Sequence, residues 1–136
     1  MLQSRGFHLD LVASVWSAPA WMKTNNQIWG DGKLKPEYYQ TWANYFIRFF
    51  QEYFNRYIDF WGVTTQNEPV DGLLNGFAFN CMGYTPEELK VFVRDYLGPT
   101  IRSSEFSYMK IITADDQRAF IKPYADEVST AAQMIH

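Results

Sequence analysis

The sequence has 136 residues, of which 47% are hydrophobic, 20% are charged and 18% are aromatic. This composition is that of an ordinary soluble globular protein and argues against disorder. The formal net charge is -3, and no basic stripe is present to neutralise phosphate groups, so the composition argues against nucleic acid as a partner.

Targeting and redox signals are sparse. The first residues, Met1 to His8, lack the basic region, apolar run and small-residue cleavage site of a signal peptide. No apolar run approaches the roughly 18 residues that suggest a membrane span. Cys81 is the only cysteine, so it cannot form an internal disulfide, and we expect a buried thiol.

The first predicted strand covers His8 to Trp16, a run rich in Leu, Val and aromatic residues that stops before a proline. A long loop follows over residues 17–35, and loops of this length in compact domains are usually functional. Lys23, Thr24 and Asn25 lie within it. Two readings remain open for these three residues, which either border the entrance to a site or form a solvated loop.

A long amphipathic helix is predicted from Pro36 to about Tyr57. Pro36 and Glu37 suit the first turn of a helix, because proline needs no partner for an N–H there and the acid meets the positive end of the dipole. Apolar residues then recur at three- and four-residue steps and form one stripe, which we expect to pack in the core. The stripe consists of Tyr39, Trp42, Ala43, Phe46, Phe49, Phe50, Tyr53 and Tyr57.

The second predicted strand, Phe60 to Thr65, is followed by a polar segment at its carboxyl end. Gln66, Asn67, Glu68 and Pro69 follow it directly. Because a proline disfavours helical backbone at the residue before it, we expect Glu68 to be extended.

The next helix is predicted to begin at Thr85, which is followed by Pro86, Glu87 and Glu88 and so has a cap, a first-turn proline and early acids. It is expected to run to about Leu97. Gly98-Pro99 would then either break the helix or mark a turn before it continues.

A third strand is predicted over Met109 to Thr113, followed by the polar run Ala114 to Arg118 and by a last helix from about Tyr124 to Ile135. Strands that alternate with helices predict an α/β fold with a parallel sheet. A closed (β/α)8 barrel typically needs about 250 residues. We therefore expect residues 1–136 to form one unit, an incomplete (β/α)8 TIM barrel.

Reactive groups of a parallel barrel stand at the carboxyl ends of its strands, where the loops converge on one pocket. Glu68 beside Asn67 at such an end suits glycoside hydrolysis, because an acid can protonate the departing oxygen while an amide holds a sugar hydroxyl. Taken alone, Asn-Glu-Pro is a weak match, and a glutamate before a proline is more often part of a solvated turn.

Several separated motifs, in order and in register, resemble the glucosylceramidases of glycoside hydrolase family 30, and the resemblance covers essentially the whole chain. The motifs are Trp16 to Asn25, Gln40 to Phe46, Phe60 to Pro69, Gly72 to Leu74, Gly83 to Glu87, Asp95 to Thr100 and Asp115 to Arg118. The resemblance implies a catalytic barrel, here about its third to fifth strands, that hydrolyses the β-glucosidic bond of glucosylceramide with retention.

The resemblance also implies roles for single residues. Glu68 matches the catalytic acid/base, Asn67 matches the amide that contacts the sugar 2-hydroxyl, and Trp16 matches a tryptophan lining the glucose subsite. A core ring at the strand end is the alternative for Trp16. No cofactor is implied. The expected partners are a β-glucoside such as glucosylceramide and a membrane surface or activator protein, and the parent protein is expected to be lysosomal or secreted.

The second carboxylate of a retaining enzyme, the nucleophile, is not matched by any residue of this sequence, so we expect the chain alone to be inactive. Asp115 and Asp116 are expected to form a hydrogen-bonding turn ion-paired with Arg118 rather than the nucleophile. No metal site is expected, because His8 and His136 are far apart and no spaced ligand set is present. A truncated inactive fragment and a related β-1,6-glucanase or β-xylosidase remain as alternatives.

Overall fold

The computed structural model describes residues 9–132 of the chain and the side chains of residues 9–129. His8, at the start of the first predicted strand, and the end of the last predicted helix, residues 133–135, lie outside the described residues, as does His136. Within them, strands and helices alternate along the chain as predicted.

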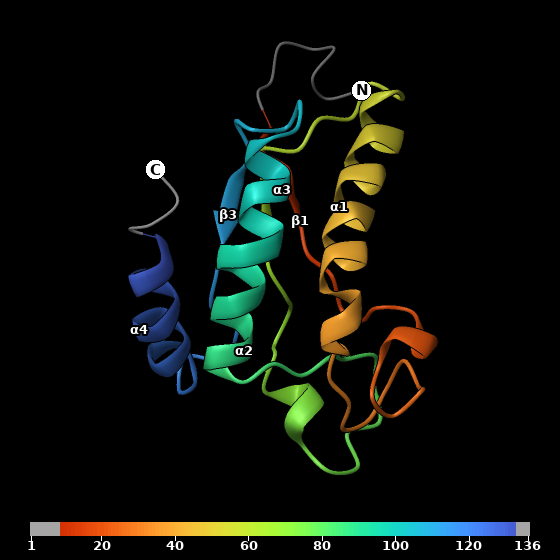
Figure 1. Cartoon of the computed structure of the whole chain (residues 1–136), viewed down its shortest axis with the longest axis vertical. Coiled ribbons are helices and arrows are strands. Elements are labelled where there is room, and N and C mark those ends of the chain that lie inside the picture. Colours follow the sequence, from red (N-terminus) through yellow and green to blue (C-terminus); the bar gives the residue numbers. More distant parts are fainter. Residues whose placement is uncertain (1–8, 133–136) are drawn as a thin grey trace.

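Three short strands form one parallel sheet. These are β1 (Val12–Ala13), β2 (Gly62–Thr64) and β3 (Lys110–Ile112), in the order β1-β2-β3. The register places Ala13 beside Val63 and Val63 beside Ile111. The strands run in one direction and their carboxyl ends meet the long loops at the lower end of the view (Figure 1). The α/β class predicted for an incomplete barrel is thereby confirmed.

The first long helix is α1 (Tyr39–Phe54), and a short 3-10 turn, η3 (Pro36–Tyr38), leads into it. The predicted apolar stripe is buried over Tyr39, Trp42, Ala43, Phe46 and Phe50.

The prediction that α1 and its stripe reach Tyr57 was wrong, since the Tyr57 side chain is 93% exposed. Its backbone turns left-handed, with φ of 62°, and the N–H of Ile58 donates to the carbonyl of Tyr53 at 3.1 Å. Such a left-handed cap ends a helix and directs the chain away from it.

A single continuous helix covers residues 86–102, made of α2 (Pro86–Val91), η5 (Phe92–Leu97) and α3 (Gly98–Arg102). Gly98-Pro99 therefore does not break it. The η5 segment is a wider π-helix, and it lies just before Pro99. A proline has no N–H to donate, and its ring crowds the carbonyl four residues earlier, so a locally widened turn lets the helix pass it.

The last helix, α4 (Ile121–Ala132), begins three residues earlier than predicted and packs against α2. Tyr124 and Val128 are buried at this contact, and the Tyr124 hydroxyl donates to the carbonyl of Tyr84 at 2.6 Å. The helices lie on one side of the sheet (Figure 1), and the apolar core fills the space between them. Among the residues that the structure describes, no helix is both long enough and apolar enough to cross a bilayer.

The long loop 17–35 is ordered by a short helix, η2 (Ala20–Met22), and by a bridge between Lys23 and Leu34. The reading of Lys23 as a solvated loop residue was wrong, because its side chain is fully buried and its Nζ donates to the carbonyl of Cys81 at 2.6 Å. The lysine thus joins this loop to the segment after β2. The prediction of a buried thiol is confirmed, since Cys81 is 2% exposed.

Candidate active site

The carboxyl ends of all three strands meet around Asn67 and Glu68. Asn67 pairs with Asp115 in a parallel bridge beyond β2 and β3, and its N–H donates to the carbonyl of Val15 at 3.0 Å. The N–H of Glu68 donates to the carbonyl of Asp115 at 2.7 Å. The convergence expected for the strand ends is therefore present.

The extended backbone predicted for Glu68 is wrong, because its φ is 37°. Pro69 occupies the second position of a tight turn, in which the N–H of Asp71 donates to the carbonyl of Glu68 at 3.0 Å. Left-handed backbone at a non-glycine residue costs roughly 1–2 kcal/mol. The hydrogen bonds on both sides of Glu68 hold this geometry and project its half-buried side chain beyond the sheet.

Two neighbours contact the carboxyl group of Glu68. The side-chain amide of Gln117 donates to its Oε1. The side chain of Asp71 shares a hydrogen bond with it, and burial, this hydrogen bond and the charges of Glu68 and Asp116 raise the pKa of Asp71 to about 6. Asp71 therefore keeps its proton to a higher pH than an ordinary aspartate does.

Sequence reasoning missed Asp71. The segment from Glu68 to Gly72 reads Glu-Pro-Val-Asp-Gly, and this order of Pro, Asp and Gly is typical of a tight turn. A turn brings the first and fourth residues together, so the spacing of Glu68 and Asp71 was the available signal.

Asp116 lies beside this pair. Its carboxylate accepts hydrogen bonds from the backbone N–H groups of Val70, at 3.2 Å, and Gln117, at 2.6 Å. Burial raises its pKa, the two N–H groups lower it in part, and the charges of Glu68 and Asp115 raise it further. Asp116 thus joins the turn after Glu68 to the end of β3.

The expected ion pair with Arg118 is absent, since the salt bridges of the described residues include none between Arg118 and either aspartate. Asp115 instead accepts a hydrogen bond from the Ser14 hydroxyl at 3.0 Å, so the hydrogen-bonding turn itself is confirmed. In the described part of the chain, no three His, Cys, Asp or Glu side chains are grouped to hold a metal ion.

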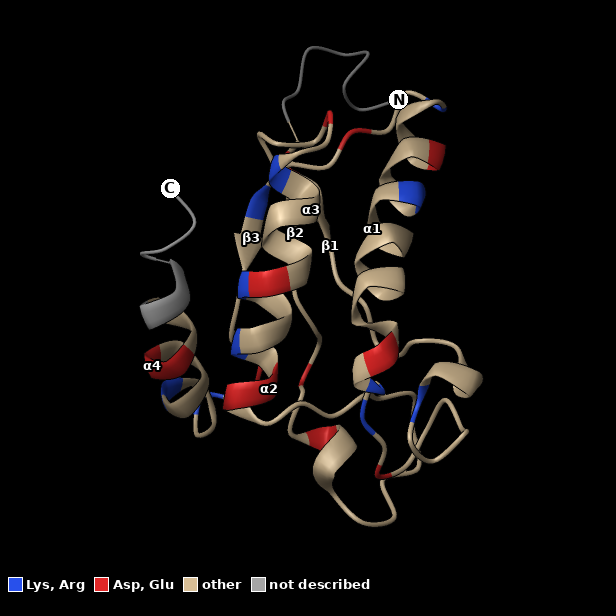
Figure 2. Ribbon diagram, in the orientation of Figure 1, with Lys and Arg blue, Asp and Glu red and all other residues tan. Residues whose placement is uncertain are grey.

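Further acidic residues lie at this end of the molecule. Figure 2 shows them at the lower end of the view, in the short helix η4 (Asp71–Leu73) and at the start of α2.

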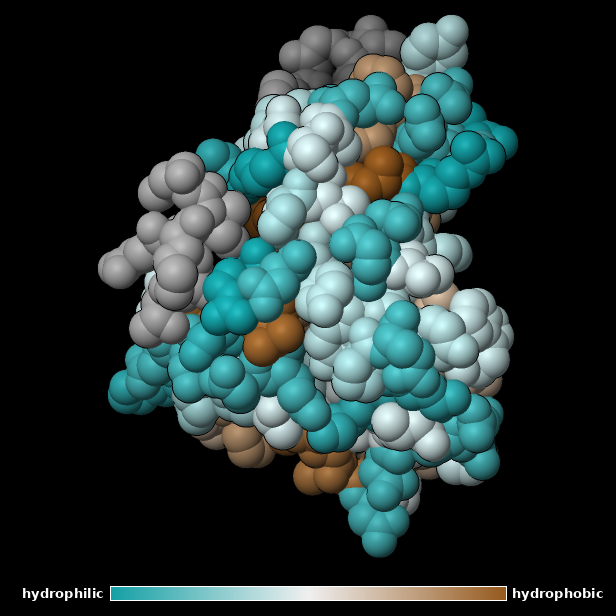
Figure 3. Space-filling view, in the orientation of Figure 1, coloured by the Kyte–Doolittle hydropathy of each residue, from teal (hydrophilic) through white to brown (hydrophobic). Residues whose placement is uncertain are grey.

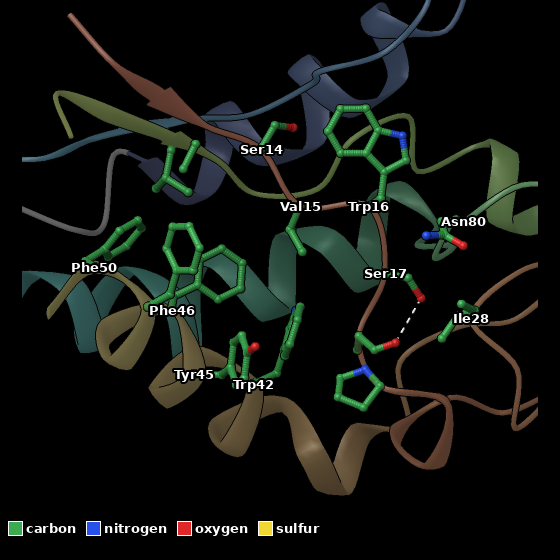
Figure 4. Close-up of a pocket in the computed structure, with 15 residues that line it drawn as sticks. Ser14, Val15, Trp16, Ser17, Ile28, Trp42, Tyr45, Phe46, Phe50 and Asn80 are labelled. Atoms are coloured by element: carbon green, nitrogen blue, oxygen red, sulfur yellow. Dashed lines mark hydrogen bonds between the residues drawn. The ribbon is translucent and has the colours of Figure 1, made fainter. Parts of the chain in front are cut away.

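Trp16 lies at the carboxyl end of β1 and is 43% exposed, so it is not a core ring of the described residues. Figure 4 shows Trp16 and Ser14 on the same side of the chain, whereas Val15 points toward α1. The buried side chain of Gln66 fixes this region, because its Nε2 donates to the carbonyls of both Trp16 and Asn67 at 2.9 Å.

A pocket of about 390 Å³ lies between β1 and α1 (Figure 4). Its lining is largely apolar and aromatic and includes Trp42, Phe46 and Phe50, but neither Glu68 nor Asp71. The pocket is therefore an opening into the core that Trp16 borders, and it does not hold the candidate acid Glu68.

The whole chain, residues 1–136, matches the TIM-barrel domain of glycosyl hydrolase family 30. The chain belongs to this family. Among family members, it is similar to lysosomal acid glucosylceramidase of Mus musculus, with 39% identity over 94% of the chain and 26% of the relative.

Two solved family structures are similar to the chain. The SrfJ protein of Salmonella typhimurium is 34% identical with a TM-score of 0.79, over 88% of this chain and 26% of that one. The endo-β1,6-glucanase BT3312 is 30% identical with a TM-score of 0.76, over 93% of this chain and 30% of that one. The chain thus spans between a quarter and a third of the length of these proteins, and the predicted barrel fragment is confirmed.

Proposed function

We propose that this segment supplies the acid/base carboxyl, Glu68, of a retaining β-glycosidase. Here the full-length enzyme means a polypeptide that carries these residues within a complete barrel. One observation carries the proposal: Glu68 stands where three parallel strand ends meet, half-buried and in contact with Gln117 and Asp71, in a family of glycoside hydrolases.

In this mechanism Glu68 begins protonated and gives its proton to the departing glycosidic oxygen. It later accepts a proton from the water that releases the sugar from the nucleophile. Retaining enzymes hold the two carboxyls about 5–5.5 Å apart, with the sugar between them. Asp71 is hydrogen-bonded to Glu68 directly, which leaves no such space, so Asp71 is not the nucleophile. We propose that the nucleophile is a carboxylate from another strand of the barrel.

Asn67 and Trp16 are proposed to bind the sugar. Asn67 is fixed by its bridge to Asp115 and can offer its amide to the 2-hydroxyl of the sugar. The exposed ring of Trp16 provides a flat apolar face, which suits packing against a pyranose ring.

Glucosylceramide is the proposed substrate, and the similarity to the mouse glucosylceramidase supports it. Exposed apolar residues on the loops beside the site suit a lipid tail, a membrane surface or an activator protein. They are Ile28, Trp29, Leu73, Leu74 and Phe79, the last of them 62% exposed. Figure 3 shows hydrophobic surface at this lower end of the molecule. A lysosomal or secreted location for the parent protein is part of the same proposal.

A β-1,6-glucanase is the second candidate, and the similarity to the glucanase structure favours it. A β-xylosidase is a further alternative within the family. On its own, the 136-residue chain is proposed to be inactive, because none of its residues matches the nucleophile.

The test compares hydrolysis of glucosylceramide, β-1,6-glucan and an aryl β-xyloside by the full-length enzyme and its Glu68→Gln variant. We expect glucosylceramide to be preferred and kcat/KM to fall by about 10³-fold in the variant, as loss of a general acid requires. Glu37→Gln is the control, since Glu37 is exposed at the start of η3. Preference for glucan would refute the sphingolipid substrate, and near-parental activity of Glu68→Gln would refute the acid/base assignment.

A further inference from the structure

We propose that Asp71 is a positioning residue for Glu68, held beside it by the tight turn that follows the strand end, where its negative charge helps Glu68 to act as the acid. The inference rests on the acid/base role proposed above. It concerns a residue three positions after the acid/base, on the turn that leaves the strand end.

The first support is the contact itself. Asp71 is bound to Glu68 twice, through the side-chain hydrogen bond and through its backbone N–H, which donates to the carbonyl of Glu68 at 3.0 Å. The short turn brings the two residues together. Gln117 donates to Glu68 from the end of β3 but brings no charge, so it leaves the repulsion between the two carboxylates uncompensated.

The second support is the rigidity of the backbone beside Asp71. A Cβ atom at Gly72 would stand 2.0 Å from the backbone nitrogen of Gly83, so only glycine fits there. The N–H of Gly32 donates to the carbonyl of Gly72 at 2.9 Å, and the N–H of Gly83 donates to the carbonyl of Gly32 at 2.8 Å. Three chain segments therefore clamp the start of η4 and hold Asp71 against Glu68.

The third support is the charge around the pair. Asp116 faces Asp71 from the end of β3, and Asp115 lies next to it. The Cys81 thiol is a further titratable group near Asp71, and the Lys23 amine and the Asp31 carboxylate act on that thiol. The lysine donates to the Cys81 carbonyl, and the charges that act on Asp71 itself are those of Glu68 and Asp116, both negative.

Two carboxyls in contact resist losing both protons, so the last proton of the pair leaves at a higher pH than it would from one carboxyl alone. When that proton is on Glu68, the residue can donate it to the departing oxygen. Once Glu68 has donated this proton, both carboxyls are ionised, and the negative charge of Asp71 favours the return of a proton from water to Glu68. Asp71 neither gains nor loses a proton over the complete reaction.

The test measures kcat/KM against pH for the full-length enzyme and its Asp71→Asn, Asp71→Glu and Glu68→Gln variants, with an aryl β-glucoside. Asp71→Asn removes the neighbouring negative charge at nearly constant shape. We expect it to move the alkaline limb of the profile toward acid by about one pH unit, with the acid-side plateau little changed. Asp71→Glu keeps the negative charge, so its alkaline limb should lie close to that of the parent enzyme. Asp126→Asn, an aspartate that pairs with Lys122 on the exposed side of α4, is the control.

The outcomes separate the two proposals. An alkaline limb that stays in place in Asp71→Asn, while Glu68→Gln loses activity, refutes this inference and leaves the acid/base role standing. A uniform loss of kcat/KM at all pH values in Asp71→Asn also refutes the inference, because it would indicate that Asp71 has a purely structural role. Near-parental activity of Glu68→Gln would instead refute the proposed function on which the inference depends.

Discussion

At the residue scale, the carboxyl of Asp71 weakens the folded state when it ionises. Burial, then the hydrogen bond and the charge of Glu68, raise its pKa to about 6 from an ordinary value of 3.8. Between these two pH values the folded protein binds more protons than the unfolded chain. The stability linked to this proton is complete below about pH 4 and is lost as the pH rises through about 6.

Asp71→Asn should therefore flatten the dependence of stability on pH. We expect the variant of the full-length enzyme to be more stable than its parent at pH 7, by about 1 kcal/mol once solvent screening of a half-buried carboxylate is allowed for. At pH 4 the two should differ little. Urea denaturation at both pH values measures this, with Asp126→Asn as the reference, and an equal effect at pH 4 and pH 7 would contradict the linkage.

The sequence predicted the positions of some of these residues but not of others. Glu68 and Asn67 were predicted at a strand end, because an apolar run followed by polar residues is visible in one segment. The contacts of Glu68 with Asp71 and Gln117 were not, since they depend on a left-handed backbone at Glu68 and on the register of β3. Lys23 was misplaced because its partner, the carbonyl of Cys81, is 58 positions away in the chain.

At the scale of elements, the start of α2 links the helix layer to the loops around the site. Thr85 and Glu88 form a reciprocal capping box, in which the Glu88 N–H donates to the Thr85 hydroxyl at 3.2 Å and the Thr85 N–H donates to the Glu88 carboxylate at 2.9 Å. Glu88 also pairs with Lys33 at 2.5 Å. One glutamate therefore caps α2 and anchors loop 17–35.

Thr85→Ala should lower the free energy of unfolding by about 1 kcal/mol, because it leaves an N–H at the helix start without its partner. Thr85→Ser keeps the hydroxyl and should lose much less. Chemical denaturation of both variants in the full-length enzyme gives the comparison. Equal losses in the two would show that the methyl group rather than the cap supplies the stability.

Elements were predicted well where periodicity or a cap defines them, as for α1 and the start of α2. Their ends were harder. The left-handed cap that ends α1 near Tyr57 is formed without a glycine, so no residue type in the sequence marks it. The passage of the helix through Gly98-Pro99 depends on a π-helix, which has no pattern in the sequence that distinguishes it from an α-helix.

At the scale of the whole molecule, the sheet has two edges, β1 and β3, that no other strand of residues 9–132 pairs with. The side chain of Val12 on β1 is 46% exposed, and the apolar pocket opens beside the same strand. Open strand edges with apolar faces pair readily with other chains. These surfaces are the ones that neighbouring units of a complete barrel would cover.

The isolated 136-residue chain is accordingly expected to self-associate and to leave a fluorogenic β-glucoside unhydrolysed. Light scattering over a concentration series measures the first property. Val12→Lys places a charge on the open edge and should reduce association, whereas Tyr57→Lys, on the exposed turn after α1, should not. Turnover by the isolated chain that disappears in Glu68→Gln would overturn the proposed inactivity.

The burial of Lys23 makes its amine a chemical probe of motion in the loops around the site. Its amine is sealed between loop 17–35 and the segment carrying Cys81, and burial lowers its pKa, whereas the side chain of Lys122 is 81% exposed. An acylating reagent can reach Lys23 only while the two loops are apart. The rate at which this amine is labelled therefore reports how often loop 17–35 separates from the segment carrying Cys81.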